Sequence, residues 1–549
     1  MALEKEIIEA EEGDHICPAE DGLVMKEGPT TMVAQCKDRP NKEKPEATMT
    51  GFGFISALLQ PLFSILIIST ASEKNTISIK LSIDQESDTV LLAEADNDFV
   101  DILRGLLKFP LGNIARLVNK HQSLQPGCLN NLYKSVENLP LKNFLTEACK
   151  RILLYPSSVH EEEFKKLKLN MDLTGSRGRF ICGNPPCNEK QGGWFSYYNT
   201  PTCTYGKLMY VHATKLRESK AVKDETEGVL YRGESMFFIT DDLRVLQGSS
   251  EDLIQFLLNL GIKNVNLIEE KFVEIGLREM TDILIHSMIS KTMLTDVFLR
   301  KQGIGSSSLL LNERPSFKAP IIKETAEKDG RTRVKMMLRK SDMKLLYAES
   351  SEKFVDLLFS FLSIPLESVL ELILGAKCNL ALGSTANLFR DLNAMFSVSN
   401  QKKSQKGVLP PFYSCPNEFP NIRSRDPPEF CYSFTKRSST FPFNTFHEAT
   451  VINKPLDPKS PKPSATNSLG YVEKNLFVIT DDLVVKPLSL ISRISLLKEL
   501  GIPLDDVEQK VISIGEVEAT ALLGACLWSF SALSVSLNFF AKKPKLEPL

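Results

Sequence analysis

The sequence predicts an α+β protein built from two tandem homologous domains, each opening with a β-hairpin that is followed by a helix. Three observations lead to this prediction. Long segments recur in the same order, alternating apolar residues open each copy, and strand-like patterns are segregated from helix-like ones along the chain. Segregated elements favour an α+β fold over a doubly wound sheet.

The repetition is carried by matching segments whose offset shrinks along the chain. Residues 91–111 match 346–366 at an offset of 255, and residues 237–245 match 477–485 at an offset of 240. A further match at an offset of 239 begins at Gly276. Shrinking offsets in a constant order indicate two collinear copies that differ by loop deletions. A period of this length is typical of duplicated domains and not of a solenoid.

The first elements of each copy follow from hydrophobic periodicity. Ile77 to Ile83 alternate apolar with polar residues, as a half-buried strand requires, and 89–93 form a second strand after a polar turn. Apolar residues then recur at helical spacing from Phe99 until Pro110 ends the helix. This order predicts a hairpin followed by a helix.

The later part of each copy is predicted in the same way. Residues 236–239 indicate a strand, and residues 253–260 an amphipathic helix that Gly261 ends. A last helix is predicted over 277–300 and mirrored by 516–539.

Composition divides the chain into five parts. We predict, in order, an acidic disordered tail that contains an apolar segment at 51–71, a first repeat domain, a linker, a second repeat domain with a Pro-rich loop at 401–470, and a basic tail. Their residues are 1–75, 76–301, 302–330, 331–541 and 542–549.

Charge and cysteine content limit the partners and the compartment. The 66 basic and 68 acidic residues leave a net charge of −2, so we expect no nucleic-acid partner. Eleven scattered cysteines are too few for a disulfide scaffold, and no secretory or transit signal opens the chain. We therefore expect reduced cysteines and a cytoplasmic or nuclear location.

Two charge-free stretches leave membrane association open. Residues 47–72 and 519–541 are each long enough for a membrane helix. The alternatives are a buried helix for both, or for 51–71 a segment foreign to the folded unit. Membrane association through 51–71 or 519–541 is therefore one hypothesis for the protein.

The combined pattern resembles the plant domain-of-unknown-function 674 family. The residues that carry the resemblance are Leu92–Asp101 continuing to Pro110–Gly112, Phe238–Val245 and Leu294–Leu299. The resemblance covers 76–301 well and 331–541 less well, and duplication of the unit is typical of the family. It implies a plant source, but no reaction is assigned to the family.

A cysteine cluster is the best candidate for a metal site. Cys182-x4-Cys187 lies in a Gly/Pro/Asn loop and is followed by Cys203 and His212. Structural zinc sites use four such thiolate or imidazole ligands. The family resembled usually has a Cys-x-Cys-Gly pair where this chain has Tyr205, so His212 would have to be the fourth ligand. Unmetallated loop cysteines and a redox pair are the alternatives.

Paired carboxylates recur at equivalent places. Asp241-Asp242 and Asp481-Asp482 could bind a metal or share a proton, but turn and N-cap chemistry is the interpretation we favour. Two other pairs recur, Glu94 with Glu349 and Asp101 with Asp356, and we favour a structural role for them as well. The glutamates lie at a strand-to-helix junction, where the helix dipole favours a carboxylate.

No motif typical of a hydrolase, kinase or dinucleotide enzyme is present in the sequence. What both copies keep is strands, helix faces and caps. The leading hypothesis is a non-enzymatic protein–protein interaction protein whose partner is unknown. The alternatives are an enzyme of unrecognised class with a site between the repeats, and a membrane-associated protein.

Overall fold

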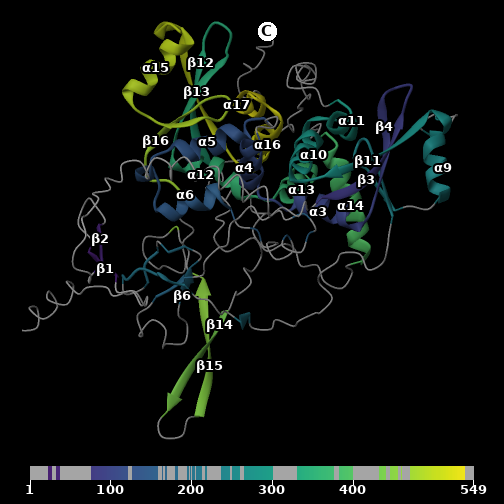
Figure 1. Ribbon diagram of the computed structural model, residues 1–549. Coiled ribbons are helices and arrows are strands. Elements are labelled where there is room, and N and C mark those ends of the chain that lie inside the picture. The colour runs from purple at the N-terminus through teal and green to yellow at the C-terminus, as the bar shows by residue number, and fades with distance from the viewer. Residues whose placement is uncertain are drawn as a thin grey trace, which may run out of the picture. The chain divides into compact units, whose positions relative to one another are not determined.

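The computed structural model describes residues 76–121, 127–156, 236–247, 265–300, 331–375, 383–399 and 470–537, together with shorter stretches between them and backbone strands elsewhere (Figure 1). The chain forms two compact units, Met1–Glu73 and Lys74–Leu549. The first contains the antiparallel pair β1 (Leu23–Lys26) and β2 (Val33–Cys36). The apolar segment 51–71 lies outside the described residues.

Two five-stranded antiparallel sheets organise the second unit. The first half (residues 76–301) contributes β3 (Ile77–Asp84), β4 (Thr89–Ala95), β9 (Phe237–Thr240), β10 (Val245–Gln247) and β11 (Ile268–Ile275) in the order β10-β9-β4-β3-β11. The second half (residues 331–541) contributes β12 (Thr332–Arg339), β13 (Leu345–Ser351), β16 (Leu476–Ile479), β17 (Val485–Pro487) and β18 (Val507–Ile514) in the order β17-β16-β13-β12-β18. The two strand orders are equivalent.

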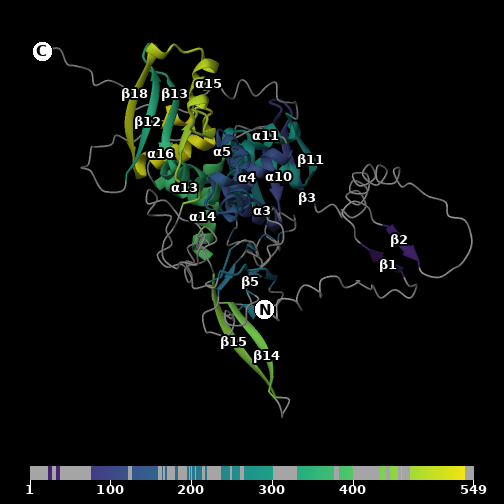
Figure 2. The same ribbon diagram turned by 90° about the vertical axis from the view of Figure 1, so that its left-hand side faces the viewer.

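Helices follow the strands in both halves (Figures 1 and 2). The first half has α3 (Asn97–Leu107), α4 (Leu111–His121), α5 (Leu129–Asn138), α6 (Glu147–Leu154), α9 (Ser250–Asn259), α10 (Leu277–Ile289) and α11 (Met293–Phe298). The second half has α12 (Glu352–Ser360), α13 (Leu366–Gly375), α14 (Thr385–Ser399), α15 (Leu490–Leu500), α16 (Glu516–Trp528) and α17 (Ala532–Leu537). The predicted α+β class is confirmed.

The opening hairpin and helix are confirmed in both halves. Ile77, Ile79, Leu81 and Ile83 are all buried, so the alternation correctly identified the core face of β3. The following helix α3 begins after Asp96, whose carboxylate accepts a hydrogen bond from the Phe99 N–H. Strand β13 leads directly into α12 in the equivalent place.

The last helix predicted for each half is in fact two helices. Helix α10 ends at Ile289 and α11 begins at Met293, while α16 ends at Trp528 and α17 begins at Ala532. A carboxylate from a distant turn binds the N-terminus of each second helix, which periodicity within one segment does not reveal.

The charge-free stretch at 519–541 is largely occupied by protein contacts. Residues 519–527 of α16 are buried, and α16 packs against α13 and β18 of its own half and α10 of the other. Within the described part of the chain, no helix combines the length and apolarity that a membrane crossing requires.

The two halves meet in a reciprocal contact. Pro110 and Pro365, which are equivalent at the 255 offset, form an antiparallel bridge. The Leu111 N–H donates to the Ile364 carbonyl at 2.9 Å, and the Leu366 N–H donates to the Phe109 carbonyl at 2.9 Å. Each half thus donates one of these hydrogen bonds and accepts the other, as a local twofold relation requires.

The region 401–470 differs from the loop expected for it. It contains the antiparallel strands β14 (Tyr432–Thr440) and β15 (Thr445–Pro455). Proline is frequent across the region as a whole, but few prolines interrupt these two segments. Thr, Val, Ile and aromatic residues within them favour extended backbone.

Candidate functional site

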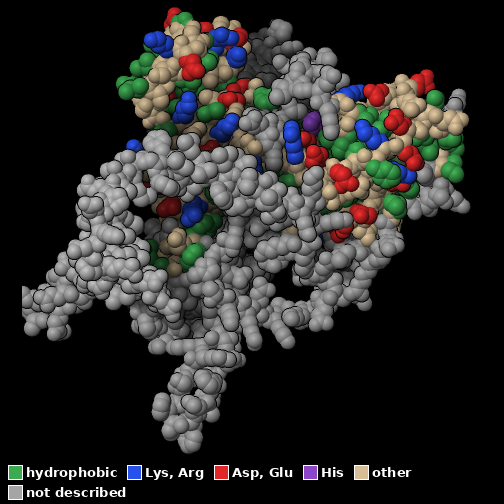
Figure 3. Space-filling model, in the orientation of Figure 1, with side chains coloured by type: hydrophobic (Ala, Val, Ile, Leu, Met, Phe, Trp, Pro, Cys, Tyr) green, Lys and Arg blue, Asp and Glu red, His purple; other side chains and the backbone are tan. Residues whose placement is uncertain are grey.

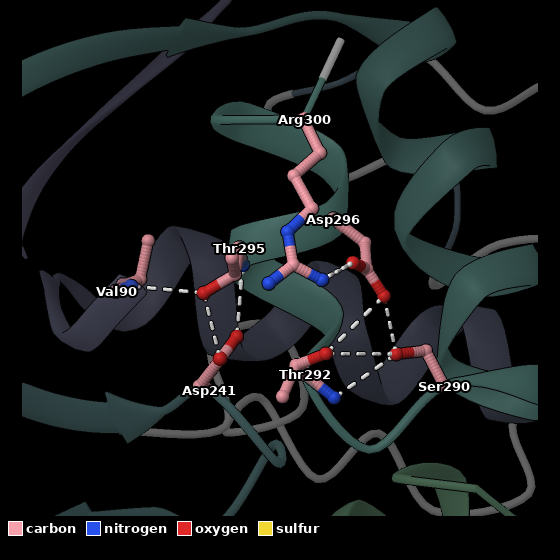
Figure 4. A network of polar contacts seen from close by, with 7 residues as sticks. All are labelled: Val90, Asp241, Ser290, Thr292, Thr295, Asp296 and Arg300. Carbon is pink, nitrogen blue, oxygen red and sulfur yellow. Dashed lines mark hydrogen bonds and ion pairs between the residues drawn. The ribbon is translucent and has the colours of Figure 1, made fainter. Parts of the chain in front are cut away.

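Asp241 is a structural anchor at the end of β9. One carboxylate oxygen accepts from the Thr295 N–H at 2.8 Å and the other from the Thr295 hydroxyl at 2.7 Å (Figure 4). Thr295 in turn accepts from the Val90 N–H at 2.8 Å, so β4, β9 and α11 are joined. Burial raises the pKa of Asp241. Both oxygens are used in holding the N-terminus of α11, which is the N-cap chemistry expected from the sequence.

The remainder of this network fixes the break between α10 and α11. Asp296 accepts from the Ser290 hydroxyl at 2.5 Å and from the Arg300 guanidinium at 3.1 Å (Figure 4). Ser290 also accepts from the Thr292 N–H at 2.9 Å. These polar side chains satisfy backbone groups that the helix break leaves without intrahelical partners.

The second half repeats the anchor with different residues. Asp481 accepts from the Ser534 N–H at 2.7 Å and the Ser534 hydroxyl at 2.8 Å. Burial raises the pKa of Asp481 as well. A serine thus takes the place of Thr295, and the same function is preserved because only a hydroxyl and a backbone N–H are needed.

The second aspartate of each turn is held by the opposite half. Asn131 on α5 donates to the carbonyl and to a carboxylate oxygen of Asp482, each at 3.0 Å. Asn387 on α14 donates to the same two groups of Asp242, again at 3.0 Å each. Each half therefore inserts a helix onto the turn of the other. This reciprocal clamp is a tertiary feature without a local sequence signal.

Two glycines allow these helices to approach. Gly127 and Gly383, just before α5 and α14, have φ of +48° and +54°. A Cβ on Gly127 would meet the Cys526 carbonyl oxygen at 2.5 Å, and one on Gly383 would meet the Ser287 carbonyl oxygen at 2.5 Å. Both glycines thus permit a left-handed conformation and a close backbone contact with the C-terminal turn of the other half's helix.

The residues after these glycines close the same contact. The Cys128 thiol donates to the Ser529 carbonyl at 2.8 Å, and the Ser384 hydroxyl donates to the Ser290 carbonyl at 2.7 Å. Burial raises the pKa of Cys128 to about 12 and that of Cys526 well above its ordinary value. Both thiols stay protonated near neutral pH, which disfavours nucleophilic or metal-binding use of them.

The recurring glutamates lie on the sheets and form ion pairs. Lys80 Nζ is 2.9 Å from Glu94, and this hydrogen bond raises the pKa of Lys80. Glu349 is buried and lies 2.8 Å from Arg493 Nε on α15 and 3.9 Å from Lys335 Nζ. These pairs hold neighbouring elements together, so the role is structural as expected, but Glu94 and Glu349 lie within β4 and β13 and act through ion pairs instead of a helix dipole.

The carboxyl group of Asp356 on α12 has a strongly raised pKa. Burial raises its pKa to about 6, although Tyr471 and Val472 donate backbone N–H bonds of 2.6 and 3.0 Å that lower it. The buried Lys459 also lowers it, and Lys459 Nζ lies 5.3 Å from the Tyr471 ring centroid. Its counterpart Asp101 lies on α3.

The segment that Asp356 binds also crosses to the first half. Val472 forms an antiparallel bridge with Phe144, and the Leu145 N–H donates to the Tyr471 carbonyl at 3.0 Å. A Cβ on Gly470 would lie 1.8 Å from an Asp356 carboxylate oxygen, so only glycine fits there. The carboxylate therefore fixes a connection between the halves.

The structure brings together two of the four predicted zinc ligands. Cys182 and Cys203 are buried in one cluster with Met209, against which Phe180 packs. Cys187 and the side chain of His212 lie outside the described residues. Among the residues that are described, no group of three or more His, Cys, Asp or Glu side chains could hold a metal. The zinc site stays a prediction, which metal analysis of the purified full chain would decide.

Sequence reasoning missed a set of exposed apolar residues that occupy equivalent positions in both halves. The pairs, with their exposed fractions, are Met236 (53%) and Leu476 (56%), Ile254 (63%) and Ile494 (58%), Val265 (68%) and Leu504 (78%), and Phe272 (73%) and Val511 (56%). In Figure 3, hydrophobic side chains gather on the surface at the helix α15 and again at the helix α9. The sequence signal that could have identified them is an apolar residue at the same predicted solvent-facing position in both copies.

Helix α15 shows how unusual this exposure is. None of its residues is fully buried, although Leu496 and Leu497 pack against the outer side of the second sheet near Tyr347. Its opposite side presents Leu490 (71%) and Ile491 (77%) to solvent. A surface helix ordinarily has charged or polar residues on that side, so apolar exposure that recurs in both halves indicates contact surfaces.

Comparison with known proteins gives one match. A family model described as "Protein of unknown function (DUF674)" matches residues 73–517. Among curated proteins, no match was found. Among solved structures, no match was found either.

Proposed function

Since the chain belongs to the DUF674 family, whose function is unknown, we propose that it is a non-enzymatic protein–protein interaction protein built from two copies of one domain. One observation supports this proposal above the others. The four pairs of exposed apolar residues recur at equivalent positions in both halves, whereas the carboxylates that recur are engaged in caps, clamps and ion pairs.

An exposed apolar side chain has a higher free energy in water than in contact with an apolar partner. A Phe side chain gains roughly 1.5–3 kcal/mol when it moves from water into an apolar contact. Phe272 is 73% exposed on a regular strand, and Val511 holds the equivalent place. Retention of apolar residues at equivalent exposed positions in both copies is what a binding surface present twice would produce.

The test is affinity purification of the tagged full chain from plant cells, followed by mass spectrometry. We expect a reproducible partner set that is lost from the double variant Phe272→Ser and Val511→Ser. Tyr210→Ser is the matched control, because Tyr210 is 68% exposed but belongs to none of the four pairs. Absence of partners above background, or a set that both variants retain equally, would overturn the proposal.

An enzyme with a site between the two halves is the second candidate. The observation that favours it is the partly buried Asp356, with a pKa raised to about 6, beside the buried Lys459. Such perturbed groups cluster at catalytic sites, although structural networks perturb pKa values too. A metabolite screen in which turnover by the full chain is lost from Asp356→Asn, with unchanged circular dichroism, would support this candidate over the first.

A further inference from the structure

The outer sides of the two sheets share their apolar positions but differ in charge. We define the first outer face as the side of the first sheet that bears Lys80, Glu270, Phe272 and Glu274. In β3 and β11, Ser78 lies opposite Glu274, Lys80 opposite Phe272, and Ser82 opposite Glu270. Directly paired residues of an antiparallel sheet project to the same side.

The second outer face has the equivalent positions on β12 and β18. Here Arg333 lies opposite Ser513, Lys335 opposite Val511, and Met337 opposite Gln509. We define the second outer face by Arg333, Lys335 and Val511. An exposed apolar residue beside a lysine is therefore common to both faces, and each lysine pairs with a strand glutamate, Lys80 with Glu94 and Lys335 with Glu349.

The charged positions around that apolar residue are different. The first outer face has two glutamates, Glu270 and Glu274, where the second has the neutral Gln509 and Ser513. The second outer face has Arg333 where the first has the neutral Ser78. Glu274 and Arg333 are both exposed, and Glu270 is 61% exposed although it also pairs with Lys80 at 3.2 Å.

We propose that the first outer face of one chain binds the second outer face of another copy, with Phe272 packed against Val511 and the glutamates beside Arg333 and Lys335. This inference rests on the proposed function and names the partner as a second copy of this chain. Apolar contact supplies the affinity, and opposite charge selects unlike faces over like ones. Two first faces would place acidic residues on both sides of the contact, and two second faces would place basic residues on both sides.

Pairing of unlike faces has a consequence for assembly. Because each chain carries one face of each kind, every bound copy still has a free face for the next. Association is therefore head-to-tail and rises with concentration, and it gives a closed ring where the rotation between copies closes and an open filament where it does not. It also weakens as salt screens the charges at the rim of the contact.

The test is sedimentation velocity of the full chain over an about hundredfold concentration range at low and high salt. We expect the average mass to rise beyond a dimer with concentration and to fall with salt. Glu274→Lys gives a chain whose first face has lost its excess of negative charge while its second face stays basic. Arg333→Glu gives a chain whose first face stays acidic while its second face has lost its excess of positive charge. Each variant alone should associate about tenfold more weakly than the unchanged chain, or not at all. An equimolar mixture of the two variants should recover association.

Two charge reversals away from the faces are the matched controls. Glu371→Lys on α13 and Lys134→Glu on α5 change exposed residues by the same charge and should leave association unchanged. Equal circular dichroism spectra exclude misfolding as the cause of any loss.

A chain that stays monomeric, an association that both charge reversals leave unaltered, or a mixture that fails to recover it would each overturn the inference. If such a chain still captured a different partner through Phe272 and Val511, the proposed function would stand and only the self-association would fail.

Discussion

Replacement of Gly383 by alanine tests whether the close approach between the two halves determines stability. The new Cβ would lie 2.5 Å from the Ser287 carbonyl oxygen and 2.8 Å from two backbone atoms of Met288. The start of α14 would have to move by about 0.9 Å to reach an ordinary contact distance. Overpacking of this kind costs about 1–3 kcal/mol, and the left-handed φ of +54° adds about 1–2 kcal/mol.

Gly501 separates these two contributions. It has a φ of +64°, but a Cβ there meets no atom within 4 Å, so Gly501→Ala should lose only about 1–2 kcal/mol. Gly383→Ala should lose about 2–5 kcal/mol, and Gly127→Ala should do the same at the equivalent place.

Urea unfolding of the full chain measures these differences. Trp528 is a useful fluorescence probe, because its indole N–H donates to the Met288 carbonyl of the other half at 2.7 Å. If Gly127→Ala and Gly383→Ala cost no more than Gly501→Ala, the reasoning that backbone contact at the two glycines holds the halves together is refuted.

Three further predictions concern polar contacts within and between the halves. Asn131→Ala and Asn387→Ala should each lower the free energy of unfolding by about 2–4 kcal/mol, because each removes two hydrogen bonds to an aspartate; urea unfolding that shows no loss for either would contradict the reciprocal clamp. Asp241→Ala should cost about 2–4 kcal/mol for the same reason, whereas alanine at the exposed Asp505 should change stability by less than about 0.5 kcal/mol. Burial raises the pKa of Asp356 from 3.8 to about 6, so the folded state holds a proton there that the unfolded state releases, and this group favours folding most below pH 4 and loses that contribution as pH rises through 6. Asp356→Asn should remove about 3 kcal/mol of this pH dependence, and parallel pH profiles for the two proteins would contradict it.

Local patterns were enough for elements whose signals lie within one segment. The alternation from Ile77 to Ile83 identified β3 and its core face, and helical spacing from Phe99 to Pro110 identified α3. The turn role of Asp241 and Asp481 also followed from residue type, since aspartate satisfies exposed backbone N–H groups. What residue type left open was which N–H groups these carboxylates would reach.

The predicted single helices over 277–300 and 516–539 failed for a nonlocal reason. The periodicity of each segment continues across Ser290 and Ser529, but the carboxylates of Asp241 and Asp481 bind a new helix N-terminus just beyond them. Those carboxylates lie some fifty residues earlier in the chain. No window of local sequence contains both partners.

The sequence by itself determined the α+β class, the opening hairpin and helix of each half, and the family, because hydrophobic periodicity and recurrence are properties of the chain alone. Only the tertiary structure decided that Asn131 and Asn387 reach across to the opposite half and that Phe272 and Val511 face solvent. An apolar residue on a strand has the same local pattern whether or not another element covers it. Its exposure depends on packing between distant segments, which is settled only when the whole chain has folded.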